Sequence, residues 1–365
     1  MDIESVEGKL LKVIGNTNSY ATWKNPGENI LHVLRGKSVT LNSVRDLGKH
    51  SGFAIAPFCL DEDYKVVIIE HDCRFESIKI DVPECLKARN STGCPGIADL
   101  KSLSDNEPDS VYMERFGIFH SAVSNGRFEK LVLSRNKSIK IDKDFSALKA
   151  FYTACIAYGD SYIYLCNTPY TGIWIGATPE VLLSVKGTNC TTVALAGTKL
   201  CNNNLLPDKW DSKNIAEQNL VANYLRNIVR NFDPAFKEDG PYPVKAGKLT
   251  HLKTVFEFRK NRETELGGLL ELIHPTPAVC GLPKREALGF ILENEGYSRG
   301  YYSGFVGKLN IEKETQLYVN LRCMNICDNV VTLYAGGGIV KESVAEDEWI
   351  ETERKMATMQ DLLFD

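Results

Sequence analysis

The C-terminal stretch, residues 317–359, restricts the fold of this chain more than any other feature. It begins with a run, residues 317–323, in which apolar and polar residues alternate, as in a β-strand with one buried face. Arg322 falls on the polar side of this alternation. A second apolar run, residues 330–335, ends in three glycines, 336–338, where the backbone can approach a ligand closely. The pattern predicts a hairpin that ends in a glycine turn beside an arginine.

A helix is expected after the glycines, with its polar residues on one face. Ser343 is expected to cap its N-terminus, and Glu346 three residues later completes a capping box. Residues that share one face of this helix, at helical spacing, are Glu348, Glu351, Thr352, Lys355 and Met359. Because two carboxylates and an ammonium share this stripe with a large apolar residue, we expect this face to be at least partly buried and not simply exposed to solvent. With the arginine and the glycines, they suggest a site for a metal ion and an anionic substrate.

Composition excludes several classes of protein. With 365 residues, 43% hydrophobic and 25% charged, the chain can build one large core or two ordinary ones. A net charge of -4 and a pI near 6.0 give no basic footprint, so nucleic acid is not an expected partner. No apolar run approaches the ~18 residues of a membrane span, and the acidic N-terminus lacks the apolar segment of a signal peptide.

The cysteines indicate a reducing compartment. Eleven of them are scattered through apolar runs, and no two are spaced as CxxC. This argues against a zinc ribbon or a thioredoxin-like motif. We therefore expect buried thiols in a cytoplasmic protein.

The first third, residues 1–110, reads as short strands and turns and offers no chemistry. Residues 52–58 and 64–70 are strand-like, and the polar residues 102–110 are typical of a surface loop. We interpret this part as a scaffold and lid over a later core.

Two charged residues flank the next apolar strands. Lys130 opens the run 128–135, and on the local sequence an edge lysine that blocks unwanted pairing is the favoured interpretation. Glu180 follows Pro179 at a corner between strand-like runs, either as a solvated turn residue or as a carboxyl aimed into a cleft. On the local sequence, the turn residue is favoured.

A predicted helix, Ser212–Phe232, places Glu217 on its apolar stripe. A buried carboxylate needs a partner, and either an ion pair with Lys213 or a metal ion could supply it. Thr198 ends a small-residue strand with a hydroxyl available to a ligand. His251 has no zinc-like spacing to another histidine or cysteine, so we expect a hydrogen-bonded residue and not a transition-metal ligand.

Taken in order, these segments resemble the chorismate-utilising enzymes, a family that includes isochorismate, salicylate and anthranilate synthases. The resemblance covers roughly residues 115–360 and rests on the ordered motifs KLVLSR, GATPE, ALAGT, the KxxxE helix, HLKT, HPTPAVCG, RGYYSG, LRC, AGGGIV and EWIETERK. It implies a single α+β domain over residues 1–365, in which two large antiparallel sheets pack face to face with helices outside. It also implies chorismate as substrate and Mg²⁺ as cofactor.

The resemblance assigns roles to individual residues. Glu217 and Glu351 would bind Mg²⁺, and Glu348 would support these ligands from outside or reach the ion through a water molecule; hard oxygen ligands suit this ion. Arg322 would hold the enolpyruvyl carboxylate as a planar bidentate donor. The other substrate-binding positions implied are Gly197, Thr198, His251, Ala278, Tyr302, Leu321, Gly336, Gly338 and Lys355. The chain departs from the family pattern at Asn214 and Gln218, next to Glu217, and mildly at AGGG, where AGAG is more usual.

Lys130 and Ala278 indicate the reaction type. Members that add water resemble this chain in having lysine at position 130, whereas members that add ammonia typically have glutamine. A neutral Lys130 would take a proton from water, and a protonated Glu180 would give one to the departing C4 hydroxyl, so both need shifted pKa values. Ala278 resembles the plain isochorismate synthases, whereas salicylate synthases tend to have threonine.

The resemblance therefore predicts an isochorismate synthase, working as a monomer or homodimer in menaquinone or siderophore synthesis. The alternatives are a salicylate synthase, which goes on to eliminate pyruvate, and a chorismate-binding protein without activity. An ammonia-using synthase is disfavoured by Lys130 and by the lack of a glutaminase domain in this chain.

Overall fold

Two antiparallel β-sheets form the centre of the molecule. The structure is a computed structural model, and it describes residues 3–71, 75–79, 109–200, 209–246, 249–260 and 265–363. Each sheet has nine strands among these residues, and all neighbouring strands in them pair antiparallel. The predicted α+β fold with two large antiparallel sheets is confirmed.

The strand order shows how distant segments are brought together. The first sheet runs β14 (Gly281–Leu282), β7 (Lys130–Lys140), β18 (Val330–Ile339), β17 (Cys323–Cys327), β9 (Gly172–Thr178), β8 (Tyr162–Thr168), β1 (Tyr20–Lys24), β2 (Ile30–Arg35) and β6 (Phe75–Lys79). The second runs β12 (Lys237–Ala246), β13 (Leu249–Arg259), β11 (Asn189–Leu200), β10 (Val181–Lys186), β16 (Glu314–Val319), β15 (Phe305–Ile311), β4 (Gly52–Ala56), β5 (Val66–Glu70) and β3 (Ser38–Leu41).

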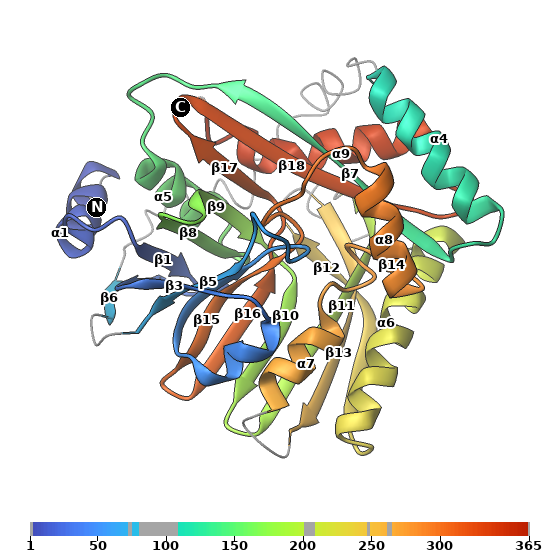
Figure 1. Cartoon of the computed structure of the whole chain (residues 1–365), viewed down its shortest axis with the longest axis horizontal. Helices are drawn as coiled ribbons and strands as arrows, with labels where there is room; N and C mark the ends of the chain where they lie inside the picture. The colour runs from blue at the N-terminus through green and yellow to red at the C-terminus, as the bar shows by residue number, and fades with distance from the viewer. Residues whose placement is uncertain are drawn as a thin grey trace.

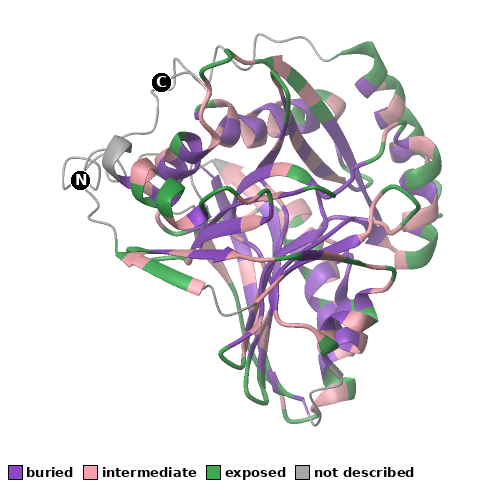
Figure 2. Cartoon of the chain, turned by 60° about the vertical axis from the view of Figure 1, so that its left-hand side comes forward, coloured by how far each residue is buried: buried purple, intermediate pink, exposed green. Residues whose placement is uncertain are grey.

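Aromatic side chains fill the space between the two sheets. Tyr162 of β8 stacks on Tyr318 of β16, with ring centroids 4.1 Å apart, and Trp23 of β1 meets Phe53 of β4 at 5.3 Å. Because large rings remove much apolar area from water, this cluster contributes strongly to holding the sheets face to face. Figure 2 shows the strands of the interior as mostly buried.

Helices cover the outer faces of the sheets (Figure 1). Their bounds are α1 (Ile3–Ile14), α4 (Ser110–Ser124), α5 (Ala147–Ala157), α6 (Ser212–Phe232), α7 (Glu265–Ile273), α8 (Lys284–Asn294) and α9 (Ala345–Gln360), with a 3-10 helix η1 (Val44–Lys49). Helix α6 packs on β11 and β13, α9 on β18, and α4 and α8 beside β7. No helix in the described ranges is both long and apolar enough to cross a bilayer.

The N-terminal third is part of both sheets, because β1, β2 and β6 join the first and β3, β4 and β5 the second. The strands expected at 52–58 and 64–70 are present as β4 and β5. Helix α1 was not predicted, although its apolar residues Val6, Leu10 and Ile14 follow the helical period and are buried. Of the loop expected at 102–110, residues 102–108 lie outside the described residues, and Ser110 begins α4.

The single strand predicted for residues 317–323 is wrong. Strand β16 ends at Val319 in the second sheet, and β17 begins at Cys323 in the first. Between them Arg322 has a φ of 47°, in the left-handed region that non-glycine residues seldom adopt. Asn320 fixes this crossover, because its amide donates to the Tyr301 carbonyl at 2.8 Å and its oxygen accepts from the Tyr164 hydroxyl at 2.6 Å.

Two further local predictions at the C-terminus are wrong. Residues 336–338 form no turn, because they continue β18 and pair with residues 132–134 of β7. Ser343 does not cap α9, since the N-cap is Val344, which has no side-chain cap bond; the Ser343 hydroxyl instead accepts from the Val340 N–H at 3.1 Å. The N-terminus of α9 is stabilised without a capping box, because the three acidic residues in its first turn interact favourably with the positive end of the helix dipole.

Candidate active site

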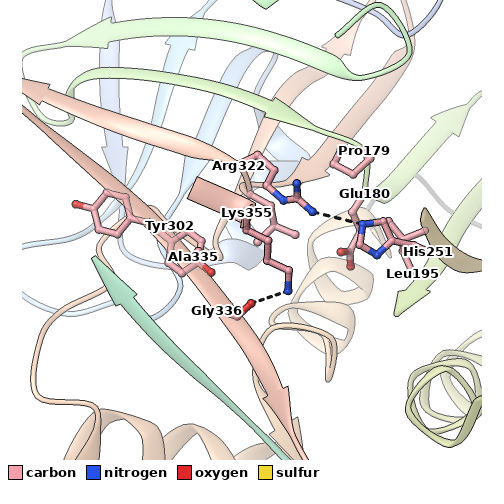
Figure 3. Close-up of a pocket in the computed structure, with 11 residues that line it drawn as sticks. Pro179, Glu180, Leu195, His251, Tyr302, Arg322, Ala335, Gly336 and Lys355 are labelled. Atoms are coloured by element: carbon pink, nitrogen blue, oxygen red, sulfur yellow. Dashed lines mark hydrogen bonds between the residues drawn. The ribbon is translucent and has the colours of Figure 1, made fainter. Parts of the chain in front are cut away.

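A pocket of about 430 Å³, partly open to solvent, lies where the ends of several strands meet helix α9. Its lining residues are Pro179, Glu180, Leu195, His251, Tyr302, Leu321, Arg322, Tyr334, Ala335, Gly336 and Lys355. Figure 3 shows Arg322, His251, Glu180 and Lys355 converging on the same space. Seven residues predicted from the sequence are among them: Glu180, His251, Tyr302, Leu321, Arg322, Gly336 and Lys355.

Glu180 is the acid of this pocket. It sits between β9 and β10, where Pro179 turns the chain, and it is only 3% exposed. Burial raises the pKa of Glu180 to about 8, and the charges of Lys130 and Lys355 offset this only in part. Its Oε1 atom is buried and has no hydrogen-bond partner among the described residues. A carboxyl that is protonated near neutral pH and has an unused oxygen is suited to donate a proton, so the solvated-turn interpretation is wrong.

Arg322 and His251 form a fixed pair. The Nη2 group of Arg322 donates to Nε2 of His251 at 3.4 Å, and Nδ1 of His251 donates to the Gly197 carbonyl at 3.0 Å. Burial and the charge of Arg322 lower the pKa of His251 to about 3, so the ring is neutral and can accept from the guanidinium. The expected hydrogen-bonded histidine is therefore present, and it orients the arginine.

Lys355 and two stacked tyrosines form another wall. The ammonium of Lys355 donates to the Gly336 carbonyl at 2.7 Å and pairs with Glu351 one turn earlier at 2.6 Å. Tyr302 stacks on Tyr334, with centroids 5.4 Å apart. The pocket therefore combines two cations, Arg322 and Lys355, with aromatic faces, which suits a ring that carries carboxylates.

Three carboxylates, each paired with a lysine, lie near the Gly336 end of the pocket, where Lys355 also lines it. Glu217 accepts from Lys130 at 2.7 Å, and Glu348 accepts from Lys213 at 2.6 Å. With the pair of Glu351 and Lys355, each acid has one lysine as counter-ion. Burial and the charge of Glu351 raise the pKa of Glu348, whereas Lys355 holds the pKa of Glu351 below its usual range despite burial.

The glycines of β18 make room for these acids. A Cβ atom on Gly338 would lie 2.5 Å from Oε1 of Glu217, and one on Gly337 would lie 2.7 Å from Oε2 of Glu348. Carboxylates from α6 and α9 therefore rest against the same strand. In the described part of the chain, no three acidic, histidine or cysteine side chains lie close enough together to hold a metal ion as they stand. The donor chemistry nevertheless suits Mg²⁺, which keeps several waters and needs only one or two carboxylates.

The structure overturns two simple explanations for the charged residues. Lys130 is not an edge lysine, because its side chain is 0% exposed and β7 lies between β14 and β18. Lys213 does not pair with Glu217 four residues away, since its ammonium reaches Glu348 on α9. A buried ammonium needs a specific partner, and here Lys130 has Glu217.

The two positions beside Glu217 that depart from the family pattern hold α6 against the sheet. Asn214 accepts from the Thr198 N–H at 2.8 Å. The buried amide of Gln218 donates to the Ala194 carbonyl at 3.2 Å and to the Thr254 hydroxyl at 3.0 Å. These bonds position the helix turn that carries Glu217.

The remaining predicted residues are near the pocket, with one exception. Gly197, at a φ of 72° in a bulge of β11, donates its N–H to Glu217 at 3.2 Å, and the hydroxyl of Thr198 lies 3.4 Å from Nδ1 of His251. Gly338 lies against Glu217 and Lys130. Ala278 does not line the pocket and packs against the core beneath α6 and α7. Its substrate-binding role stays a prediction.

Four lining residues were missed from the sequence: Pro179, Leu195, Tyr334 and Ala335. Each is adjacent or close to a residue that was singled out, and the motifs GATPE, ALAGT and AGGGIV contain three of them. No periodic signal distinguishes them from ordinary strand residues.

Comparison with known proteins gives a consistent result. Residues 75–364 match the family described as chorismate binding enzyme. Isochorismate synthase EntC of Escherichia coli K12 is 30% identical over 242 residues, covering 63% of this chain and 61% of EntC. The salicylate biosynthesis isochorismate synthase of Pseudomonas aeruginosa is 29% identical over 254 residues, covering 67% and 52%. The chain thus spans only about half to three fifths of the length of these relatives.

Solved structures agree with the fold. DhbC of Bacillus anthracis, described as an isochorismate synthase specific for 2,3-dihydroxybenzoate, superposes with a TM-score of 0.77 at 22% identity, covering 98% of this chain and 99% of that one. Anthranilate synthase component I of Streptococcus pneumoniae gives a TM-score of 0.64 at 19% identity, covering 96% and 84%. At these identities the similarity establishes a shared architecture.

Proposed function

Because this chain belongs to the family of chorismate-binding enzymes, we propose that it isomerises chorismate to isochorismate. Water would add at C2 of the ring while the C4 hydroxyl leaves as water, so the net change moves a hydroxyl. The observation that carries the proposal is Glu180, a buried acid with a raised pKa and an unpartnered oxygen in a pocket with two cations. The relatives named isochorismate synthase support the same reaction.

Substrate binding would use the cationic wall. Arg322 offers a planar pair of donors to the enolpyruvyl carboxylate, and its contact with neutral His251 sets the plane of the guanidinium. Lys355, held by Gly336 and Glu351, adds positive charge to the same space. Arg322 is buried and Lys355 is partly buried, and this strengthens the attraction because less water screens their charges.

The acid and base would act from different elements. Glu180 would give its proton to the departing C4 hydroxyl, which requires a carboxyl that stays protonated at neutral pH. Lys130 would accept a proton from the attacking water once it releases Glu217, its partner in this structure. The positive charge of Lys130 opposes the effect of burial on the pKa of Glu180, so the proposed base and acid influence each other electrostatically.

We also propose that the reaction depends on Mg²⁺. Glu217 and Glu351 would hold the ion, with Glu348 through a water molecule, and it would supply positive charge for the ring carboxylate. The support is the donor set itself, three carboxylates gathered against glycines that leave them room. The three lysines that pair with these acids here would have to give up those contacts when the ion binds.

The proposal is tested by incubating the purified protein with chorismate and Mg²⁺ and separating the products by chromatography. We expect isochorismate. Salicylate together with pyruvate would favour a salicylate synthase, and chorismate bound without turnover would favour a binding protein. Lys130→Ala should abolish turnover while calorimetry still detects chorismate binding, whereas Lys140→Ala, at the exposed end of the same strand, should leave the rate unchanged. A near-normal rate for Lys130→Ala would contradict the assignment of the base.

A further inference from the structure

A second pocket, separate from the candidate active site, lies beside the first turn of α4. It spans about 510 Å³, including space that is open to solvent, and is lined by Asp109, Tyr112, Arg115, Arg135, Asn136 and Tyr297. These residues come from the start of α4, the middle of β7 and the segment after α8. None of them lines the pocket that contains Glu180. The proposed reaction uses no part of it.

Arg115 gives this pocket a cation that has no counter-ion among the residues that the structure describes. Its guanidinium forms no ion pair or hydrogen bond with any residue that the structure describes. It lies over Gly296, where a Cβ atom would collide with the guanidinium nitrogens. Gly296 has a φ of 78°, so both the backbone conformation and the space favour glycine there. The chain thus accommodates this arginine at the wall of the pocket, and no residue in the described ranges neutralises it.

Tyr112 supplies an unpartnered buried hydroxyl. The residue is 2% exposed, its ring meets the edge of Trp349 at 5.2 Å, and its hydroxyl has no hydrogen-bond partner within the described ranges. Leaving a phenolic O–H unpaired away from water costs free energy, which an acceptor atom on a ligand would recover. The contact with Trp349 places this hydroxyl beside helix α9, and the charges of Glu348 and Glu351 on that helix act on it together with the opposing charge of Arg135.

The local charge balance favours an anion. Arg135 lies over the Trp349 ring at 3.6 Å and pairs with Glu353, to which Lys137 also approaches at 3.6 Å. One carboxylate therefore serves two cations. The only acid in the lining, Asp109, is engaged in capping α4, where it accepts from the N–H groups of residues 111 and 112 at 2.7 and 2.9 Å. Positive charge is left over at the wall that carries Arg115.

We propose that this pocket binds a small molecule through an oxyanion, a carboxylate or a phosphate, held by Arg115 with Tyr112 as a second donor. A guanidinium binds either group in a bidentate manner, which is why the two classes share this chemistry. Tyr297, whose hydroxyl lies 2.5 Å from that of Ser134, would border the remainder of the ligand.

The test is calorimetric titration with inorganic phosphate and, separately, with malonate. Because Arg322 also attracts anions in the candidate active site, the titrations are made in an Arg322→Met background. We expect saturable binding of at least one probe, and Arg115→Met should weaken it about tenfold or more. Arg115→Lys should weaken it less, because lysine keeps the positive charge but loses the bidentate pair of N–H donors. Arg127→Met is the matched control, since its guanidinium lies over Phe128 and Phe290, outside the pocket.

The preferred probe identifies the ligand class as phosphate or carboxylate. The proposal is overturned if neither probe binds saturably, or if Arg127→Met weakens binding as much as Arg115→Met, which would indicate diffuse attraction. Circular dichroism of each variant verifies that the fold is kept. Because the readout is binding in a variant that lacks the active-site arginine, its failure would leave the proposed isomerase activity untouched.

Discussion

Replacing Glu180 with glutamine removes a buried titrating group but keeps the shape of the protonated carboxyl. Burial moves the pKa of this carboxyl from 4.5 to about 8, although Lys130 and Lys355 pull in the opposite direction. Between these two pH values the folded protein keeps the proton, whereas the unfolded chain has lost it. The folded state therefore binds one more proton than the unfolded chain in this window. Because a higher pH disfavours the state that binds more protons, the free energy of unfolding falls as the pH rises.

The size of the effect follows from the shift. Each pH unit in the window costs the wild type about 1.4 kcal/mol, so the free energy of unfolding falls by roughly 5 kcal/mol between pH 4.5 and 8 on account of this group. Glutamine carries no proton to lose. Relative to wild type, the Glu180→Gln variant should therefore gain stability steadily as the pH is raised, and the gain should level off above about pH 8.

Urea unfolding of both proteins at pH 5, 6.5 and 8 measures this difference. The matched control is Glu314→Gln, because hydrogen bonds from Lys186 and Lys308 lower the pKa of Glu314. That carboxyl is ionised in the folded state throughout the window and mostly ionised in the unfolded chain from about pH 5 upwards, so its variant should differ from wild type by a nearly constant amount. If the Glu180→Gln difference were equally constant, the carboxyl would not be held protonated by burial, and the reasoning for a proton donor would fail.

The same variant separates stability from catalysis. Without a transferable proton, Glu180→Gln should lose turnover by roughly 100-fold or more at pH 7 while it still binds chorismate. In the wild type, kcat should decline above about pH 8 as the acid ionises. A rate that stays flat to pH 9.5 would contradict the assignment.

Three further outcomes test the site. Gly338→Ala should lower the rate roughly tenfold or more with the fold intact by circular dichroism, because the new methyl would lie 2.5 Å from Oε1 of Glu217 and 2.6 Å from Cε of Lys130; an unchanged rate would show that these groups can move aside freely. Arg322→Lys should raise KM for chorismate about tenfold or more, since the bidentate fork is lost, and an unaltered KM in steady-state assays would count against the carboxylate contact. Chelation by EDTA should abolish turnover and added Mg²⁺ should restore it, whereas full activity in EDTA would refute the metal proposal.

Features set by local periodicity could be predicted from the sequence. The helix Ser212–Phe232 was predicted with the bounds that the structure has, because its apolar residues repeat at the helical period. The strand at 317–323 failed for the opposite reason. The alternation of Leu317, Val319, Leu321 and Cys323 continues unbroken while the chain passes from one sheet to the other. Period-two patterning reports burial of a face but not the sheet to which that face belongs.

Partners distant in the sequence explain the other differences. Glycines 336–338 are typical of a turn, yet β7 lies alongside them and extends the strand. Lys130 was favoured as an edge residue because its acid, Glu217, is 87 positions away, and Lys213 finds its acid 135 positions away. Spacing rules apply within one element and cannot locate such pairs. The resemblance to a family indicated the cluster, and the sheet order shows how it is assembled.

The crossover at residues 320–322 makes the position of Arg322 depend on how the two sheets are aligned with each other. One short segment joins the two sheets and carries Arg322, so a small slide of one sheet over the other would carry the guanidinium with it. Truncating Tyr162 or Tyr318, which stack between the sheets, would then weaken binding of the carboxylate although neither residue contacts the ligand. If Arg322 binds the substrate carboxylate as proposed, the affinity for the substrate depends on how the two sheets pack against each other.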